Sequence, residues 1–151
     1  MNALSFLETN IFLRHLRQDH ADFSPRATAL LHRIEQGSLK VRTADTVIFE
    51  TVFTLERVYK QSKEAIRDAF LPLIELPGIV LPGKRRFRQV FAYYIDKNIS
   101  FADAYHTVLM ESLRLRQIVS FDRDFDRIPS LKRVEPDTTG ELITHQRSSE
   151  R

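Results

Sequence analysis

The sequence has 151 residues and no cysteine, which excludes both a disulfide framework and a thiolate metal site. It also lacks an apolar run long enough to cross a membrane, and its start has no basic segment followed by an apolar stretch and a cleavage site. Neither sign of charge dominates, because 23 Lys and Arg face 20 Asp and Glu. This mildly basic balance permits an anionic partner without requiring one. We therefore expect a cytoplasmic protein that does not associate with a membrane.

The sequence does contain enough apolar material for one core. Hydrophobic residues make up 42% of the chain, and 11 of them are Phe. A chain of this length and composition fits a single globular domain. From Asp137 onward the residues are polar and show no periodicity, so we expect a domain over residues 1–136 and a flexible polar tail over 137–151.

Short apolar segments alternate with helical patterns along the domain. The expected strands lie at 3–7, 39–45, 79–81, 117–121 and 132–136. The clearest helix, over 84–98, carries Phe87, Val90, Phe91, Tyr94 and Ile95 as one apolar stripe, which is typical of a core-facing helix. Strands separated by helices predict a three-layer α/β/α sandwich with a central, mostly parallel sheet of four to five strands.

Acidic residues lie where such a sheet binds its ligands, near the carboxyl ends of the strands. Glu8 ends the first expected strand and Asp122 ends the fourth. Asp103 lies in the first turn of the helix that begins near Ser100, and Glu50 lies in the helix after the second strand. We therefore expect these four carboxylates to converge at one edge of the sheet.

Most of these acids also have a purely structural explanation. Asp103 fits a capping box with Ser100. Glu50, although its apolar neighbours should shield it in part, can be a solvated acid at a helix edge, and Asp122 can belong to an ordinary charged turn. Glu8 is the hardest to explain in this way, because an unpaired carboxylate after a buried strand costs several kcal/mol.

Four carboxylates at one edge repel one another unless a cation neutralises them. Because the chain has no cysteine and its five histidines form no obvious ligand pair, the expected ligands are oxygen atoms, which favour Mg²⁺ or Mn²⁺ over Zn²⁺. Such a site suits hydrolysis of a phosphodiester. The basic candidates for RNA binding are Arg14, Arg17, Lys84, Arg85 and Arg86, and a solvated helix face explains any one of them equally well.

Four segments carry these acids: FLETNIFLRHL, FETVFTLERVY, ISFADAYHTVL and IVSFDRDFDRIP. In order and spacing they resemble the four acidic motifs of PIN-domain ribonucleases, and the single-domain length is similar to that of VapC toxins of bacterial toxin–antitoxin systems. The resemblance covers residues 4–136. It implies a metal-dependent endoribonuclease that hydrolyses single-stranded or loop RNA, such as tRNA or rRNA. It also implies one or two Mg²⁺ or Mn²⁺ ions, a homodimer and a cognate antitoxin protein.

The resemblance also implies roles for individual residues. The catalytic acids would be Glu8, Glu50, Asp103 and Asp122. Glu8, Asp103 and Asp122 would bind the metal, with Glu50 and Asp124 as further candidate ligands. Asn10 and Ser120 would orient these acids by hydrogen bonds.

One position departs from the family pattern. The first acid of the family is nearly always Asp, whereas this chain has Glu8, whose extra methylene moves the carboxylate by about 1.5 Å. Because Mg²⁺ demands near-ideal octahedral geometry, such a shift can lower the rate on the order of a hundredfold. A working natural variant, an inactive natural toxin and an engineered substitution are three explanations that the sequence leaves open.

Two other functions remain as alternatives. The first is a catalytically impaired or silent PIN-like module that binds RNA or protein, with Glu8 as the cause of the lost activity. The second is an acid-cluster phosphatase, which the sequence disfavours because "ETN" lacks a nucleophilic Asp at the end of the first strand.

Overall fold

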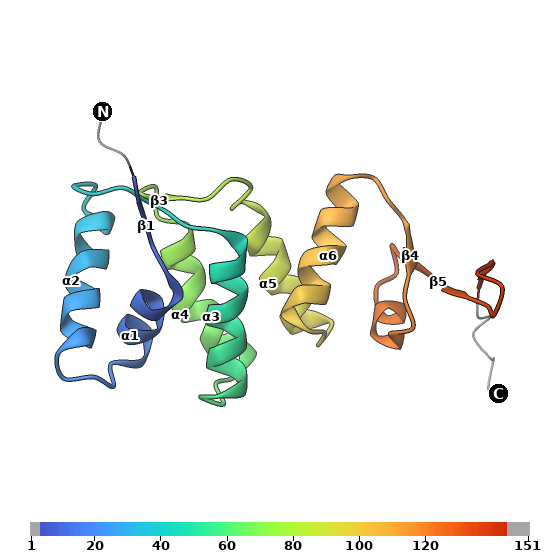
Figure 1. The fold of residues 1–151 in the computed structure, drawn as a ribbon, viewed down its shortest axis with the longest axis horizontal. Coiled ribbons are helices and arrows are strands. Elements are labelled where there is room, and N and C mark those ends of the chain that lie inside the picture. Colours follow the sequence, from blue (N-terminus) through green and yellow to red (C-terminus); the bar gives the residue numbers. More distant parts are fainter. Residues whose placement is uncertain (1–3, 145–151) are drawn as a thin grey trace.

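The computed structural model describes residues 4–144, in which short strands alternate with longer helices (Figure 1). The first expected strand therefore begins one residue outside the described chain. No helix within the described range is both long and apolar enough to cross a membrane. The elements in order are β1 (Ser5–Phe6), α1 (Thr9–Arg17), α2 (Phe23–Glu35), β2 (Val41–Arg42), α3 (Asp45–Arg57), α4 (Lys63–Ile74), β3 (Ile79–Val80), α5 (Arg86–Asp96), α6 (Phe101–Ser112), β4 (Gln117–Val119), the 3₁₀ helix η1 (Arg123–Arg127), β5 (Lys132–Pro136) and β6 (Leu142–Ile143).

The strands form two separate sheets. In the first, β1, β2 and β3 are parallel and lie in that order, with Ser5 opposite Val41 and Val41 opposite Ile79. In the second, β4 pairs with β5 in parallel and β5 pairs with β6 in antiparallel fashion. The α/β class with a parallel sheet is confirmed, but the prediction of one sheet with four to five strands is wrong. The physical reason is the position of α6, which lies between β1 and β4 along the long axis of the molecule (Figure 1).

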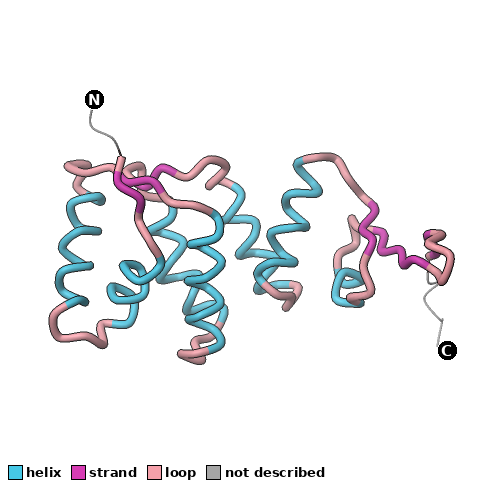
Figure 2. The backbone as a smooth tube through the Cα atoms, in the orientation of Figure 1, coloured by secondary structure: helices cyan, strands magenta, loops and turns pink. Residues whose placement is uncertain are grey.

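Helices supply most of the core, since the strands are only two to five residues long (Figure 2). The rings of Phe12 in α1 and Phe70 in α4 meet edge to face, with their centroids 5.1 Å apart. The predicted apolar stripe of α5 is confirmed: Phe87, Val90, Phe91 and Tyr94 are buried, and Ile95 packs against them from a partly buried position. Burial of large apolar side chains is the main source of stability in such a fold.

Part of the expected polar tail is ordered against the second sheet. The carboxylate of Asp137 accepts hydrogen bonds from the backbone N–H groups of Thr139 and Glu141, at 2.8 and 3.0 Å. This turn returns the chain so that β6 pairs with β5. A side chain therefore supplies a turn at the start of the expected tail that composition alone does not reveal, while the flexibility of the tail stays a prediction. The rest of the expected tail, 145–151, lies outside the described residues.

A buried arginine joins β4, η1 and β5. The guanidinium of Arg133 in β5 donates to Asp126 Oδ1 at 3.0 Å and to the backbone oxygen of Ser120 at 3.0 Å. Its Nη1 also lies 3.3 Å from Glu135 Oε2, and the side chain is only 5% exposed. Arg133 thus fixes the loop after β4 to the strand beside it.

We expect Arg133→Met to lower the free energy of unfolding by about 1–3 kcal/mol, because Asp126 and the backbone oxygen of Ser120 lose a charged donor. Lys132→Met is the matched control, since Lys132 is its exposed neighbour in β5 and should change stability by less than about 0.5 kcal/mol. Urea denaturation of both variants measures the difference. Equal midpoints for the two variants would contradict the assigned role of Arg133.

Candidate functional site

Three acidic side chains meet between the start of α6 and the loop after β4. Asp103, Asp122 and Asp124 each offer one carboxylate oxygen, and these oxygens all lie within 4.8 Å of one another. Asp103 lies in the first turn of α6, Asp122 is the N-cap of η1, and Asp124 lies in its first turn. We call this group the aspartate cluster.

Short-range hydrogen bonds fix the backbone on both sides of the aspartate cluster. The hydroxyl of Ser100 accepts from the N–H of Asp103 at 3.1 Å, which is the helix cap predicted from the sequence. In the opposing loop, the hydroxyl of Ser120 accepts from the N–H of Asp122 at 3.0 Å, and the carboxylate of Asp122 accepts from the N–H of Asp124 at 2.9 Å. The local sequence therefore determines how each carboxylate enters the cluster.

The environment of Asp103 disfavours its ionised form. Partial burial is the largest cause that raises the pKa of the Asp103 carboxyl, and the neighbouring Asp122 raises it further. The hydrogen bond with Ser100 acts in the opposite direction. A carboxylate crowded by a like charge in this way gains most from a nearby cation.

Two further acids form a separate group at the end of β1. Glu8 is the N-cap of α1, and its carboxylate accepts from the N–H of Asn10 at 3.2 Å. The hydroxyl of the buried Thr9 donates to Glu50 Oε2 at 2.9 Å, which ties α3 to the start of α1. Both glutamates are exposed, and Glu50 fits the alternative of a solvated acid at a helix edge. We call Glu8 and Glu50 the glutamate pair.

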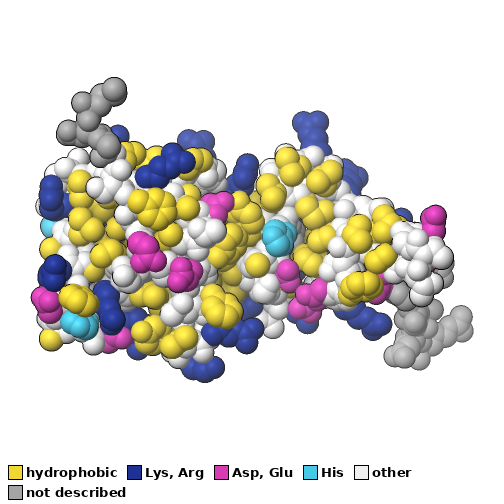
Figure 3. Space-filling model, viewed as in Figure 1, with side chains coloured by type: hydrophobic (Ala, Val, Ile, Leu, Met, Phe, Trp, Pro, Cys, Tyr) yellow, Lys and Arg dark blue, Asp and Glu magenta, His cyan; other side chains and the backbone are white. Residues whose placement is uncertain are grey.

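The structure therefore brings together three of the predicted acids and places the other two elsewhere. Figure 3 shows two groups of acidic side chains on one face of the molecule, with apolar and uncharged surface between them. One group lies over the end of β1 and α3, and the other lies over the start of α6 and the loop after β4 (Figures 1 and 3). The order of the elements in the sequence does not predict this separation. Both groups follow strand ends, as expected, but the strands belong to different sheets.

The predicted supporting residues have different surroundings. Ser120 lies beside the aspartate cluster and holds the turn at Asp122. Asn10 is exposed, and its backbone N–H, rather than its side chain, contacts Glu8.

The predicted basic residues are dispersed. The ammonium group of Lys84 donates to the backbone oxygens of Leu76 and Ile79 at 2.7 and 2.8 Å, so it fastens the loop before β3 to the loop after it. Arg17 stacks over the ring of Tyr59, with 4.3 Å from Cζ to the centroid. The remaining members of the set, Arg14, Arg85 and Arg86, are exposed or partly exposed.

Comparison with known families identifies the family of this chain. Residues 5–131 match the model of the PIN domain family. This chain belongs to the PIN domain family. PIN domains are generally metal-dependent nucleases, so the family supports a nuclease fold and a divalent metal. A search of the curated proteins finds no match to the chain.

The donor set of this PIN domain fits a hard divalent cation. Three carboxylate oxygens within 4.8 Å of one another are the ligands such an ion prefers, and a cation would favour the ionised form of Asp103, which burial and then Asp122 disfavour by raising its pKa. The described residues offer no second group of three or more acids or histidines at such spacing. The aspartate cluster is therefore the candidate metal centre of this PIN domain.

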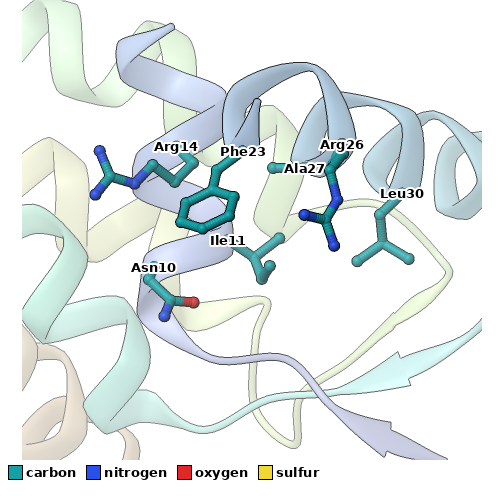
Figure 4. Close-up of a pocket in the computed structure, with 7 residues that line it drawn as sticks. All are labelled: Asn10, Ile11, Arg14, Phe23, Arg26, Ala27 and Leu30. Carbon is teal, nitrogen blue, oxygen red and sulfur yellow. The ribbon is translucent and has the colours of Figure 1, made fainter. Parts of the chain in front are cut away.

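The PIN domain also has a pocket that the sequence analysis missed. It has a volume of about 500 Å³ and lies between α1 and α2. Figure 4 shows Arg14 and Arg26 from the two helices with the ring of Phe23 at this pocket, and Asn10 at its other end. The only sequence signal was an apolar residue, Phe23, at the exposed start of a helix.

We expect Asp103→Asn to stabilise the metal-free protein at neutral pH, because it removes a carboxylate whose ionised form the fold disfavours. Since the pKa of Asp103 is raised in the folded state, this cost is present above that pKa and disappears as the pH falls through it. The advantage of the variant should therefore vanish in acid. Added Mn²⁺ should reverse the order at neutral pH, because the wild type alone keeps the full ligand set.

Thermal unfolding midpoints at neutral and acidic pH, with and without MnCl₂, measure these effects. Asp96→Asn at the exposed end of α5 is the matched control and should respond to Mn²⁺ as the wild type does. An equal Mn²⁺ response of the wild type and Asp103→Asn would contradict the assignment of the metal centre.

Proposed function

We propose that this PIN domain is a metal-dependent endoribonuclease that hydrolyses phosphodiester bonds in single-stranded or loop RNA, such as tRNA or rRNA. The observation that carries the proposal is the aspartate cluster, a set of oxygen ligands at the end of a parallel strand in a member of a nuclease family. Mg²⁺ or Mn²⁺ is the proposed ion, because the cluster contains only carboxylates.

The residues of the chain have distinct proposed tasks. Asp103, Asp122 and Asp124 hold the ion, and Ser100 and Ser120 fix the backbone that presents them. When bound, the ion supplies Lewis-acid activation of the attacking water and neutralises charge that develops on the phosphate.

The pocket between α1 and α2 favours an unpaired nucleotide as its ligand. Phe23 exposes 47% of its surface, and since the imidazole of His20 stacks on one face of its ring at 4.1 Å, a base would stack on the other face. Arg14 and Arg26 line the same pocket, where they pair with Asp19 at 3.4 Å and Asp22 at 3.2 Å, and a phosphate would compete with these exposed carboxylates for them. Stacking requires a base that is not paired in a helix, which is the basis for proposing single-stranded or loop RNA.

The toxin role and its partners are part of the same proposal. We infer a VapC-type toxin whose activity in the cytoplasm is held in check by a cognate antitoxin protein, and we infer a homodimer. Large apolar side chains are exposed on several elements, among them Phe53 in α3 and Leu113 after α6, and a protein partner would cover such groups on binding.

We expect the purified chain to cleave RNA in the presence of Mg²⁺ or Mn²⁺ and to stop when EDTA is added. Asp103→Asn and Asp122→Asn should each lower the cleavage rate on the order of a hundredfold, because each removes a ligand charge. Asp96→Asn should leave the rate unchanged. A panel of tRNA and rRNA-loop substrates, resolved on denaturing gels, measures this, and cleavage that survives both ligand variants would refute the proposal.

A second function, a silent RNA-binding module, is favoured by one observation: the carboxylate of Glu8 serves as a helix cap. Glu8→Asp separates the two functions, because Asp is also a good N-cap and keeps that contact. If Glu8 impairs catalysis, we expect Glu8→Asp to cleave up to about a hundredfold faster than the wild type. RNA binding without cleavage by both proteins, measured by fluorescence anisotropy and gel assays, would favour the silent module.

A further inference from the structure

The outer strands are β1 and β3 in the first sheet and β4 and β6 in the second, and the outer edges of β1 and β4 have no partner in the described chain. Leu7 donates its N–H to Arg42 of β2 at 2.7 Å, and backbone groups alternate in direction along a strand, so those of Phe6 point away from β2. Ser120 donates to Val134 of β5 at 3.0 Å, so the backbone groups of Val119 point away from β5. An exposed strand edge of this kind is a template for pairing with another strand.

The side chains beside these two edges are apolar and exposed. Phe6 in β1 exposes 58% of its surface, and Phe121, which follows β4, exposes 70%. Leu4 and Val119 flank them and are exposed as well. Yellow side chains are visible on the surface around β1 and around β4 in Figure 3. Pairing of the two edges would bury apolar groups from both strands at once.

Pairing would also unite the two groups of acids. Glu8 follows β1 by two residues and Asp122 follows β4 by three residues. If β1 and β4 are parallel neighbours, their carboxyl ends lie at the same edge of one sheet. The glutamate pair and the aspartate cluster would then face one site, which neither sheet forms alone.

Contacts within the chain hold β4 away from its own β1. Phe101 at the start of α6 packs its ring 5.0 Å from that of Phe91, and Tyr105 donates its hydroxyl to Asp45 of α3 at 2.6 Å. Arg127 in η1 donates to the backbone oxygen of Asn98 at 2.8 Å, which fixes the β4–β6 unit beside α6. While these contacts stand, α6 lies between the two edges (Figure 1), so a β4 strand that pairs with β1 has to come from another copy of the chain.

We propose that two copies of this chain form a strand-exchanged dimer in which β4 of each copy pairs in parallel with β1 of the other. Each of the two resulting sheets has the order β3-β2-β1-β4-β5-β6, with the last three strands from the other copy. Each active centre then combines Glu8 and Glu50 of one copy with Asp103, Asp122 and Asp124 of the other. Two identical contacts related by a two-fold axis close the assembly. The reaction at this shared centre rests on the function proposed above, but the assembly does not.

Crosslinking tests the assembly without any measurement of activity. The chain has no native cysteine, so Phe6→Cys combined with Val119→Cys offers only two thiols to a short bismaleimide. We expect a covalent species of two chains. In a mixture of ¹⁵N-labelled and unlabelled protein, we expect crosslinked peptide pairs in which position 6 comes from a labelled chain and position 119 from an unlabelled chain, or the reverse. Phe6→Cys with Val58→Cys is the matched control, because Val58 is equally exposed but lies in the C-cap of α3.

Light scattering of the unmodified full chain should give the mass of two chains at micromolar concentration. Linked peptides that carry one isotope only, or the mass of a single chain at every concentration, would overturn the proposal in favour of closure within one chain. Linkage equal to that of the control pair would overturn it as well.

Complementation then tests whether the active centre is shared. Glu50→Gln and Asp122→Asn are each expected to lower the cleavage rate on the order of a hundredfold when tested alone. After the two are unfolded together and refolded as an equal mixture, half of the dimers are mixed, and one of the two centres in each mixed dimer has every acid intact. The mixture should therefore recover about a quarter of the wild-type rate. If the wild type is active and the refolded mixture recovers no activity, the shared centre is overturned. If the wild type itself is inactive, the nuclease function is refuted, and crosslinking alone decides the assembly.

Discussion

The packing of one phenylalanine determines where half of the candidate site lies. The ring of Phe101 lies 5.0 Å from Phe91, 5.4 Å from Tyr94 and 5.4 Å from Phe49, so the first residue of α6 is embedded between α3 and α5. Asp103 follows two residues later and has no freedom to move independently of this aromatic cluster. The same packing sets the course of α6, and the course of α6 keeps the second sheet apart from the first.

The other half of the candidate site depends on polar contacts at a helix start. Thr9 is buried and donates to Glu50, while Glu8 accepts from the backbone of its own helix. These contacts involve only β1, α1 and α3, and the contacts of the aspartate cluster involve only α6, β4 and η1. No hydrogen bond among those described joins the glutamate pair to the aspartate cluster, although α3 and α6 touch through the rings of Phe49 and Phe101, so each group of acids is held by its own contacts. A centre that is assembled from two such halves requires no local rearrangement of either one.

Local patterns in the sequence predicted the local structure well. The apolar stripe of α5 is buried, and the pairing of Ser100 with Asp103 caps α6, because both features depend only on residues within one or two helical turns. The convergence of Asp103 with Asp122 also follows from sequence. Helix α6 is followed directly by β4, which returns in the opposite direction, so the start of the helix and the end of the strand lie at the same end of the pair.

Long-range features could not be predicted in this way. The split of the sheet depends on where α6 packs, and that depends on aromatic contacts between helices far apart in sequence. Lys84 illustrates the same limit at one residue: its place in a basic run suggested phosphate binding, but its ammonium group is bonded to two backbone oxygens. The exposure of Glu50 has a related cause, because its apolar sequence neighbours face the core while the helix turns the carboxylate outward.

The separation of the acids has an energetic consequence for folding. Five carboxylates in one site repel one another, and the pKa of Asp103, raised mainly by burial, is raised further by the neighbouring Asp122 alone. A chain that holds the glutamate pair elsewhere avoids the additional repulsion while it folds. In the proposed dimer that repulsion arises only when the two sheets pair, at the stage when buried apolar strand edges and a bound cation can both offset it. Assembly and metal binding would then be thermodynamically linked, since each favours the state that the other requires.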